Sequence, residues 1–350
     1  MSLQKLVGSM LMFGFEGGSL AEKQTRTDIA ELKAIGVRGV ILFDHDLKAN
    51  GPRNIQSPKQ LAKLIEDLRN ELGSDLIIAI DQEGGAVARL DKHNGFLPTI
   101  SAVEFGTMLE IDQVQYAHKQ ANQLAKLGIN LNFAPCVDLA LKPGSPIIAG
   151  KERAFGVAPS EVIDCAHKVI DAHQQAGIGC CIKHFPGHGS SLMDSHLGLC
   201  DITNSHIDHE TEVFKQLITR FNTQIAVMTG HLMHTIIDPA LPASLSKQHT
   251  TQMLRKELGF EGVVITDSLD MRAIRDHFGE GDSAVHAINA GADLILDGFN
   301  APGYRQGGGP TRIAGAILNA AKQGEIEDPE QRFVESCDRL DLFFAHATAD

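Results

Sequence analysis

The chain has 350 residues, with 31 basic and 44 acidic side chains and a formal net charge of −13. Hydrophobic residues make up 43% and charged residues 21%, which is typical of a folded protein with an apolar core rather than a disordered chain. The acidic balance and the lack of a basic run argue against a nucleic-acid partner and against binding to an anionic membrane.

The first apolar run, residues 6–15, follows Lys5 and resembles the apolar region of a secretory signal. We interpret residues 7–13 instead as the first buried strand. No run approaches the ~20 apolar residues that cross a bilayer. The six cysteines form no CxxC pair, which is typical of free thiols in a reducing compartment. We therefore expect a cytoplasmic protein.

Short apolar runs recur along the chain, and each precedes a stretch with helical periodicity. Their continuous apolarity is typical of strands that are covered on both faces. The eight runs are 7–13, 37–43, 76–80, 129–133, 178–182, 225–228, 262–265 and 292–296. Ser57 before Pro58 predicts the start of a helix over 58–72, and similar signals predict helices from Pro159 and over 330–344.

Eight strand–helix repeats predict an α/β fold, a single (β/α)8 TIM-type barrel. A doubly wound open sheet is the alternative, because the number of strands does not by itself close a barrel. No linker rich in proline, glycine or serine divides the chain. We therefore expect residues 1–350 to form one catalytic domain.

Charged residues follow three of these runs at the same relative position. Asp81 follows the third run, Lys183 and His184 follow the fifth, and Asp267 follows the seventh. In a barrel, the carboxyl ends of the strands and the loops after them form the active site. Each residue alone could be a helix cap or a loop ion pair, but three in register favour a functional site.

The segment that follows Lys183 also contains Asp194 and His196. A carboxylate that accepts a hydrogen bond from one ring nitrogen raises the basicity of the other, which suits a general acid/base. The alternative is a surface pair that contributes little.

Histidines four apart also raise the possibility of a metal site at His184 and His188, with His231 and His234 near the sixth run. Pro186 prevents the regular helix that zinc-binding pairs of this spacing use. We therefore expect no metal and no cofactor, and we expect His188 to brace its loop.

Five segments occur in a fixed order along the chain. They are IDQEGG at 80–85, NFAP at 132–135, ERAFG at 152–156, KHFPGHG at 183–189 with DSH at 194–196, and GVVITD at 262–267. Together they resemble glycoside hydrolase family 3, in its β-N-acetylhexosaminidase branch, over about residues 7–300.

The resemblance implies a retaining mechanism in which Asp267 attacks the anomeric carbon. It implies that His196, with Asp194 as its partner, is the acid/base. It also implies a set of residues that hold the sugar hydroxyls and the N-acetyl group, namely Asp81, Arg89, Arg153, Lys183 and His184.

The resemblance thus implies a hydrolase that releases terminal β-linked N-acetylglucosamine, from a small N-acetylglucosaminide or a muropeptide of cell-wall peptidoglycan turnover. A phosphorylase or transglycosylase, a β-glycosidase of different sugar specificity, and a non-catalytic sugar-binding barrel are the alternatives. The cations in the set predict a positively charged site suited to a carboxylate-bearing substrate. The absence of tryptophan favours one terminal sugar over a long polysaccharide cleft.

Overall fold

The computed structural model describes residues 1–142, 145–194, 198–301 and 308–348. Within these residues, eight parallel strands form the central sheet: β1 (Leu11–Phe13), β2 (Gly39–Leu42), β5 (Ile77–Ile80), β6 (Leu131–Asn132), β7 (Gly179–Phe185), β9 (Ala226–Thr229), β11 (Val263–Thr266) and β12 (Ile295–Asp297). Their order is β11-β9-β7-β6-β5-β2-β1-β12. The two edges meet, because Ile265 of β11 pairs with Leu294, the residue before β12. The sheet is therefore a closed barrel, which confirms the predicted (β/α)8 fold over the open sheet.

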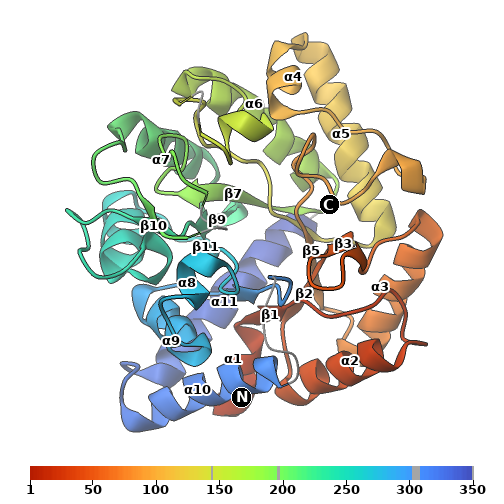
Figure 1. Cartoon of the computed structure of the whole chain (residues 1–350), viewed down its shortest axis with the longest axis vertical. Coiled ribbons are helices and arrows are strands. Elements are labelled where there is room, and N and C mark those ends of the chain that lie inside the picture. The colour runs from red at the N-terminus through yellow and green to blue at the C-terminus, as the bar shows by residue number, and fades with distance from the viewer. Residues whose placement is uncertain (143–144, 195–197, 302–307, 349–350) are drawn as a thin grey trace.

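Helices surround this barrel (Figure 1). Those of the described residues are α1 (Leu3–Ser9), α2 (Lys23–Ile35), α3 (Pro58–Leu72), α4 (Ala102–Thr107), α5 (Glu110–Leu127), α6 (Pro159–Gln175), α7 (Asp208–Phe221), α8 (Arg272–Arg275), α9 (Glu280–Ala290), α10 (Gly309–Gln323) and α11 (Pro329–Thr348). The crossover from β9 to β11 contains the π-helical segment Gln248–Glu257. The predicted starts at Pro58 and Pro159 are confirmed, and Ser57 Oγ caps α3 by accepting from Gln60 N at 3.3 Å. The helix predicted over 330–344 is α11, which extends from Pro329 to Thr348.

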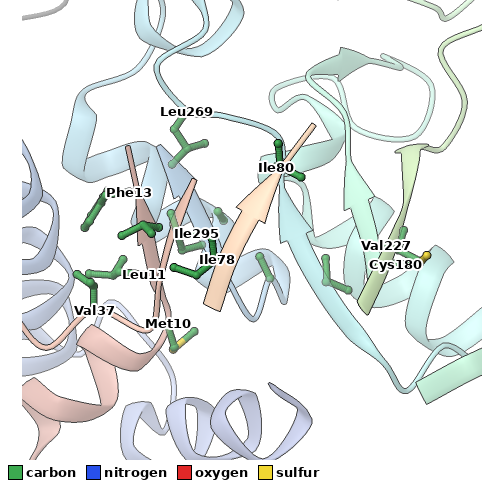
Figure 2. Close-up of a cluster of buried hydrophobic side chains, with 14 of the residues drawn as sticks. Met10, Leu11, Phe13, Val37, Ile78, Ile80, Cys180, Val227, Leu269 and Ile295 are labelled. Carbon is green, nitrogen blue, oxygen red and sulfur yellow. The ribbon is translucent and has the colours of Figure 1, made fainter. Parts of the chain in front are cut away.

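Both faces of the strands are apolar because each face packs against a separate layer. In β5, Ile77 and Ala79 belong to the cluster inside the barrel, whereas Ile78 and Ile80 belong to the cluster between the strands and the helices. Figure 2 shows Ile78 and Ile80 among the side chains of this outer cluster. This arrangement explains why the strands appear in the sequence as continuous apolar runs.

The last helix closes one end of the barrel. Leu340 and Phe343 of α11 join the cluster inside the barrel. The ring of Phe343 lies so close to Gly179, the first residue of β7, that a Cβ there would come within 2.7 Å of it. Because α11 covers the amino ends of the strands, a ligand has to enter from their carboxyl ends.

The N-terminal run differs from the prediction. Residues 3–9 form helix α1, which Ser2 caps, and only Leu11–Phe13 is a strand. Leu6 and Val7 are buried, so the predicted burial of this run is confirmed, but the strand predicted from residue 7 is wrong up to residue 10. None of the helices in the described part of the chain is long and apolar enough to span a membrane.

Two short pairs of strands lie outside the barrel. β3 (His45–Asp46) and β4 (Gly51–Pro52) pair antiparallel in the loop after β2. β8 (Cys200–Asp201) pairs in parallel with β10 (Leu232–Met233), so it ties the loop after β7 to the loop after β9.

Candidate active site

The predicted sugar-binding residues and the predicted nucleophile end a strand or follow one. They are Asp81 after β5, Arg89 in the same loop, Arg153 in the loop after β6, Lys183 and His184 in β7, and Asp267 after β11. Asp81, Arg89 and Asp267 line one cavity of about 180 Å³. The structure thus brings residues more than 180 positions apart in the chain to one place at the open end of the barrel.

Lys183 is buried beside this cavity, with its side chain 3% exposed. Its Nζ lies 2.7 Å from Asp81 Oδ1 and 2.7 Å from Glu83 Oε1. Burial alone would lower the pKa of Lys183, but the two carboxylates raise it above its ordinary value. Lys183 therefore stays charged and is a fixed hydrogen-bond donor.

Glu83 belongs to the site, although the sequence analysis did not select it. Arg153 Nε and Nη2 donate to its two oxygens at 2.8 and 2.7 Å in a bidentate pair. Burial would raise the pKa of Glu83, but Arg153 and Lys183 hold it well below its ordinary value. The available signal was its position two residues after Asp81, within the same segment.

His184 lies between Arg153 and a second residue that the sequence analysis missed, Asp138. His184 Nδ1 is 2.6 Å from Asp138 Oδ2, and His184 Nε2 is 3.3 Å from Arg153 Nη2. Burial would raise the pKa of Asp138, but the contacts with His184 keep it below its ordinary value. A single aspartate in the apolar stretch after a predicted strand was the signal for it.

Arg89 extends the ion pairs toward the rim, with Nη2 3.6 Å from Asp81 Oδ2 and Nη1 3.8 Å from Asp44 Oδ1. Each of Arg89, Arg153 and Lys183 thus lies within ion-pairing distance of a carboxylate. Among the described residues, these three cations face the five carboxylates of Asp44, Asp81, Glu83, Asp138 and Asp267. For the described part of the site, the prediction of a positive charge is therefore wrong, because it counted the cations without their partners.

Asp267 stands at the end of β11, where the backbone holds it. Its N–H donates to Thr229 O at 3.0 Å, and its Oδ1 accepts from Ser268 N at 2.8 Å. The other strand ends at this cavity contribute Phe133, Met228 and Leu296. Asp267 therefore lines a cavity whose other lining residues are both apolar and charged.

The predicted acid/base pair lies in the loop after β7. Asp194 is partly buried there, whereas His196 lies outside the described residues, so the pairing of the two stays a prediction. The start of this loop is anchored, because Ser190 N donates to Glu210 Oε1 at 3.1 Å and His188 N donates to Asp138 Oδ1 at 2.7 Å. His188 is 2% exposed, which supports a bracing role.

One group in the described part of the chain could offer a metal three ligand atoms within 4.8 Å of one another, namely Cys136, Asp138 and His184. Burial raises the pKa of the Cys136 thiol well above its ordinary value, and the thiol donates to Asp138 Oδ2 at 3.4 Å. The thiolate is the form of cysteine that binds metal, and Cys136 is held as a thiol. We therefore interpret Cys136, Asp138 and His184 as a hydrogen-bonded cluster. His231, near the sixth apolar run, has both ring nitrogens next to protein atoms: Nδ1 lies 2.8 Å from Ser244 Oγ, and Nε2 lies 2.9 Å from Ser268 O.

Comparison with known proteins identifies the family. The model of the glycosyl hydrolase family 3 N-terminal domain matches residues 2–340. The chain belongs to glycosyl hydrolase family 3. A beta-hexosaminidase of Idiomarina loihiensis is 33% identical over 296 residues, which cover 82% of this chain and 83% of that protein. Beta-hexosaminidase A of Pseudoalteromonas piscicida is 33% identical over 287 residues, 74% of this chain but 45% of that protein.

Solved structures of other proteins share the fold. A β-N-acetylglucosaminidase from Paenibacillus sp. has a TM-score of 0.84 and 34% identity, covering 100% of this chain and 64% of that chain. A β-N-acetylhexosaminidase from Beutenbergia cavernae has a TM-score of 0.84 and 25% identity, covering 99% of both chains. This family 3 chain therefore spans less than half of one relative and nearly the full length of another.

Proposed function

We propose that the chain is a retaining β-N-acetylhexosaminidase that releases terminal β-linked N-acetylglucosamine from small glycosides. The observation that carries the proposal is the position of Asp267, at a strand end in the same cavity as Asp81 and Arg89. The names of the relatives, beta-hexosaminidase and β-N-acetylglucosaminidase, support N-acetylglucosamine as the sugar.

In the proposed reaction, the Asp267 carboxylate attacks the anomeric carbon while His196 gives its proton to the departing glycosidic oxygen. The bond to the leaving group breaks as an ester bond forms between the sugar and Asp267. His196 then takes a proton from water, whose oxygen attacks the same carbon and releases Asp267. Two displacements at one carbon retain its configuration, and Asp194 holds the imidazole of His196 throughout.

The buried ion pairs support the roles proposed for the sugar-binding residues. Lys183 and Arg153 are each held by carboxylates at 2.7–2.8 Å, so their remaining N–H groups point in fixed directions. Asp81 can accept from sugar hydroxyls, and Arg89 can donate to them at the rim. Groups that are oriented before the substrate arrives avoid the cost of reorganising during the reaction.

The proposal includes a source for the sugar, which is peptidoglycan turnover fragments in the cytoplasm. The six cysteines are free and buried, which suits a reducing compartment. The charge of the cavity, however, gives no support for a carboxylate-bearing leaving group. We also propose that residues 1–350 work as one catalytic domain, because the barrel and the helix that closes it, α11, together extend from residue 3 to residue 348.

The test compares aryl β-glycosides of glucose, N-acetylglucosamine and N-acetylgalactosamine. We expect turnover of the N-acetylglucosaminide, and we expect Asp267→Asn to abolish it while the variant still binds N-acetylglucosamine by calorimetry. Turnover by Asp267→Asn would overturn the assignment of the nucleophile. Formation of N-acetylglucosamine 1-phosphate on addition of phosphate would replace hydrolysis by phosphorolysis.

A further inference from the structure

Asp138 has no exposed side-chain surface, and both of its oxygens are engaged. Oδ1 accepts from His188 N at 2.7 Å, and the two oxygens lie 3.3 and 3.2 Å from His184 N. Oδ2 also accepts from Cys136 Sγ and lies 2.6 Å from His184 Nδ1. The carboxylate therefore binds the backbone of β7 and the loop after it, together with the ring of His184.

The two neighbours of the His184 ring require a single protonation state. An ionised carboxylate can only accept, so the Nδ1 that faces Asp138 at 2.6 Å must carry the proton. A guanidinium can only donate, so the Nε2 that faces Arg153 Nη2 at 3.3 Å must be bare. A doubly protonated ring would place two donors against each other at Nε2.

We propose that Asp138 is a positioning residue that holds the His184 proton on Nδ1, so that the bare Nε2 accepts from Arg153 and fixes the direction of the guanidinium. This inference rests on the proposed function only for the identity of the ligand. With Nη2 held between Glu83 and His184, Arg153 presents its remaining N–H to the sugar in one orientation. An imidazole free to change its tautomer would not hold the guanidinium in this orientation.

The variant Asp138→Asn keeps the size of the side chain and changes only its hydrogen bonding. If the amide oxygen accepts from His188 N, the amide N–H groups face Nδ1 of His184. The ring must then move its proton to Nε2, where it meets the N–H of Arg153, or leave its position. We expect kcat/KM for the N-acetylglucosaminide to fall about 10- to 100-fold, the range found when an orienting partner behind a ligating histidine is removed.

The decisive measurement is the nitrogen NMR spectrum of the free protein labelled at its histidine rings, with His184→Gln used to assign the signal. We expect a protonated Nδ1 and a bare Nε2 at His184 in the wild type, and the loss of that pattern in Asp138→Asn. Cys136→Ser is the matched control, because it keeps a donor to Asp138 Oδ2 and should retain the pattern.

A wild-type spectrum with the proton on Nε2 would overturn the inference, and this readout does not depend on whether the variant folds. The inference would equally fail if Asp138→Asn kept both the pattern and the wild-type kcat/KM. The spectrum needs no substrate, so the absence of glycosidase activity would contradict the proposed function and leave the test of Asp138 intact.

Discussion

Glu83 accepts hydrogen bonds from two buried cations, Lys183 at 2.7 Å and Arg153 at 2.7 and 2.8 Å. Removing the charge of one member of a buried ion cluster leaves the others without compensation, which typically costs about 3–5 kcal/mol. We expect Glu83→Gln to lower the free energy of unfolding by about this amount in urea denaturation, and to raise KM because both cations lose their position.

Glu71→Gln is the matched control for this substitution. Glu71 forms a single ion pair with Lys33 at 2.9 Å, and both side chains are about half exposed. Exposed pairs contribute at most about 1 kcal/mol. Equal losses of stability in the two variants would show that the buried cluster has no special role.

Both members of the Lys183–Asp81 pair could be predicted from the sequence, but only one member of each pair that Glu83 or Asp138 completes. Asp81, Lys183 and Asp267 could be identified because each follows an apolar run at the same position. Asp138 does not directly follow an apolar run, and its pairing with His184, which lies 46 residues later in the chain, could not be predicted. The local sequence carries no information on such a distant pairing, and the wrong charge prediction has the same origin.

At the scale of elements, burial was easier to predict than backbone geometry. The eight apolar runs correspond to the eight barrel strands, and Ser57 with Pro58 marks the start of α3. The run at residues 7–13 divides into a helix and a three-residue strand, because a buried helix and a buried strand are equally apolar. Short apolar runs therefore predict that a segment is buried better than they predict whether it is a helix or a strand.

The loop after β7, which carries the predicted acid/base pair, depends on a close approach to α7. Gly187 has φ of +137°, and a Cβ at this position would lie 2.5 Å from Glu210 Cβ. Strain of this kind costs about 1–3 kcal/mol. We expect Gly187→Ala to displace the loop and lower kcat/KM at least tenfold for natural glycosides with poor leaving groups, and less for activated aryl glycosides.

Gly198 lies in the same loop and provides the control. A Cβ at Gly198 would have no atom of the described residues within 4 Å, so Gly198→Ala should behave as the wild type. Kinetics with a series of aryl leaving groups distinguishes the outcomes. If Gly187→Ala lowered kcat/KM by the same factor for every leaving group, the loop would not act through proton donation to the leaving group.

At the scale of the whole molecule, the barrel could be predicted because counting strands requires no knowledge of side-chain contacts. Closure of the barrel by the bridge between Ile265 and Leu294 could not, since it depends on the register between the first and last strands. The position of α11 across the amino ends of the strands also came from the structure, through Phe343 and Gly179.

Buried neutral histidines predict how the stability of the whole molecule depends on pH. Burial lowers the pKa values of His173, His188 and His249 to about 4, whereas in the unfolded chain a histidine titrates near 6.5. Between these values the unfolded chain binds protons that the folded protein does not. The stability that these three histidines contribute is therefore fully present above about pH 6.5 and is lost as the pH falls toward 4.

We expect the urea midpoint to fall from pH 7 to pH 5, with each of these histidines contributing at most about 1.4 kcal/mol per pH unit. His249→Asn removes one of them and keeps a donor for Ser246 Oγ, which lies 3.0 Å from His249 Nδ1. This variant should therefore have a flatter pH dependence than the wild type.

His93→Asn, a change at an exposed histidine, should leave the slope unchanged. The carboxyls of the half-buried Asp28 and the buried Glu210, whose pKa values burial raises, oppose the trend equally in all three proteins, so the difference in slope isolates His249. Parallel curves for the three proteins would contradict this origin of acid sensitivity.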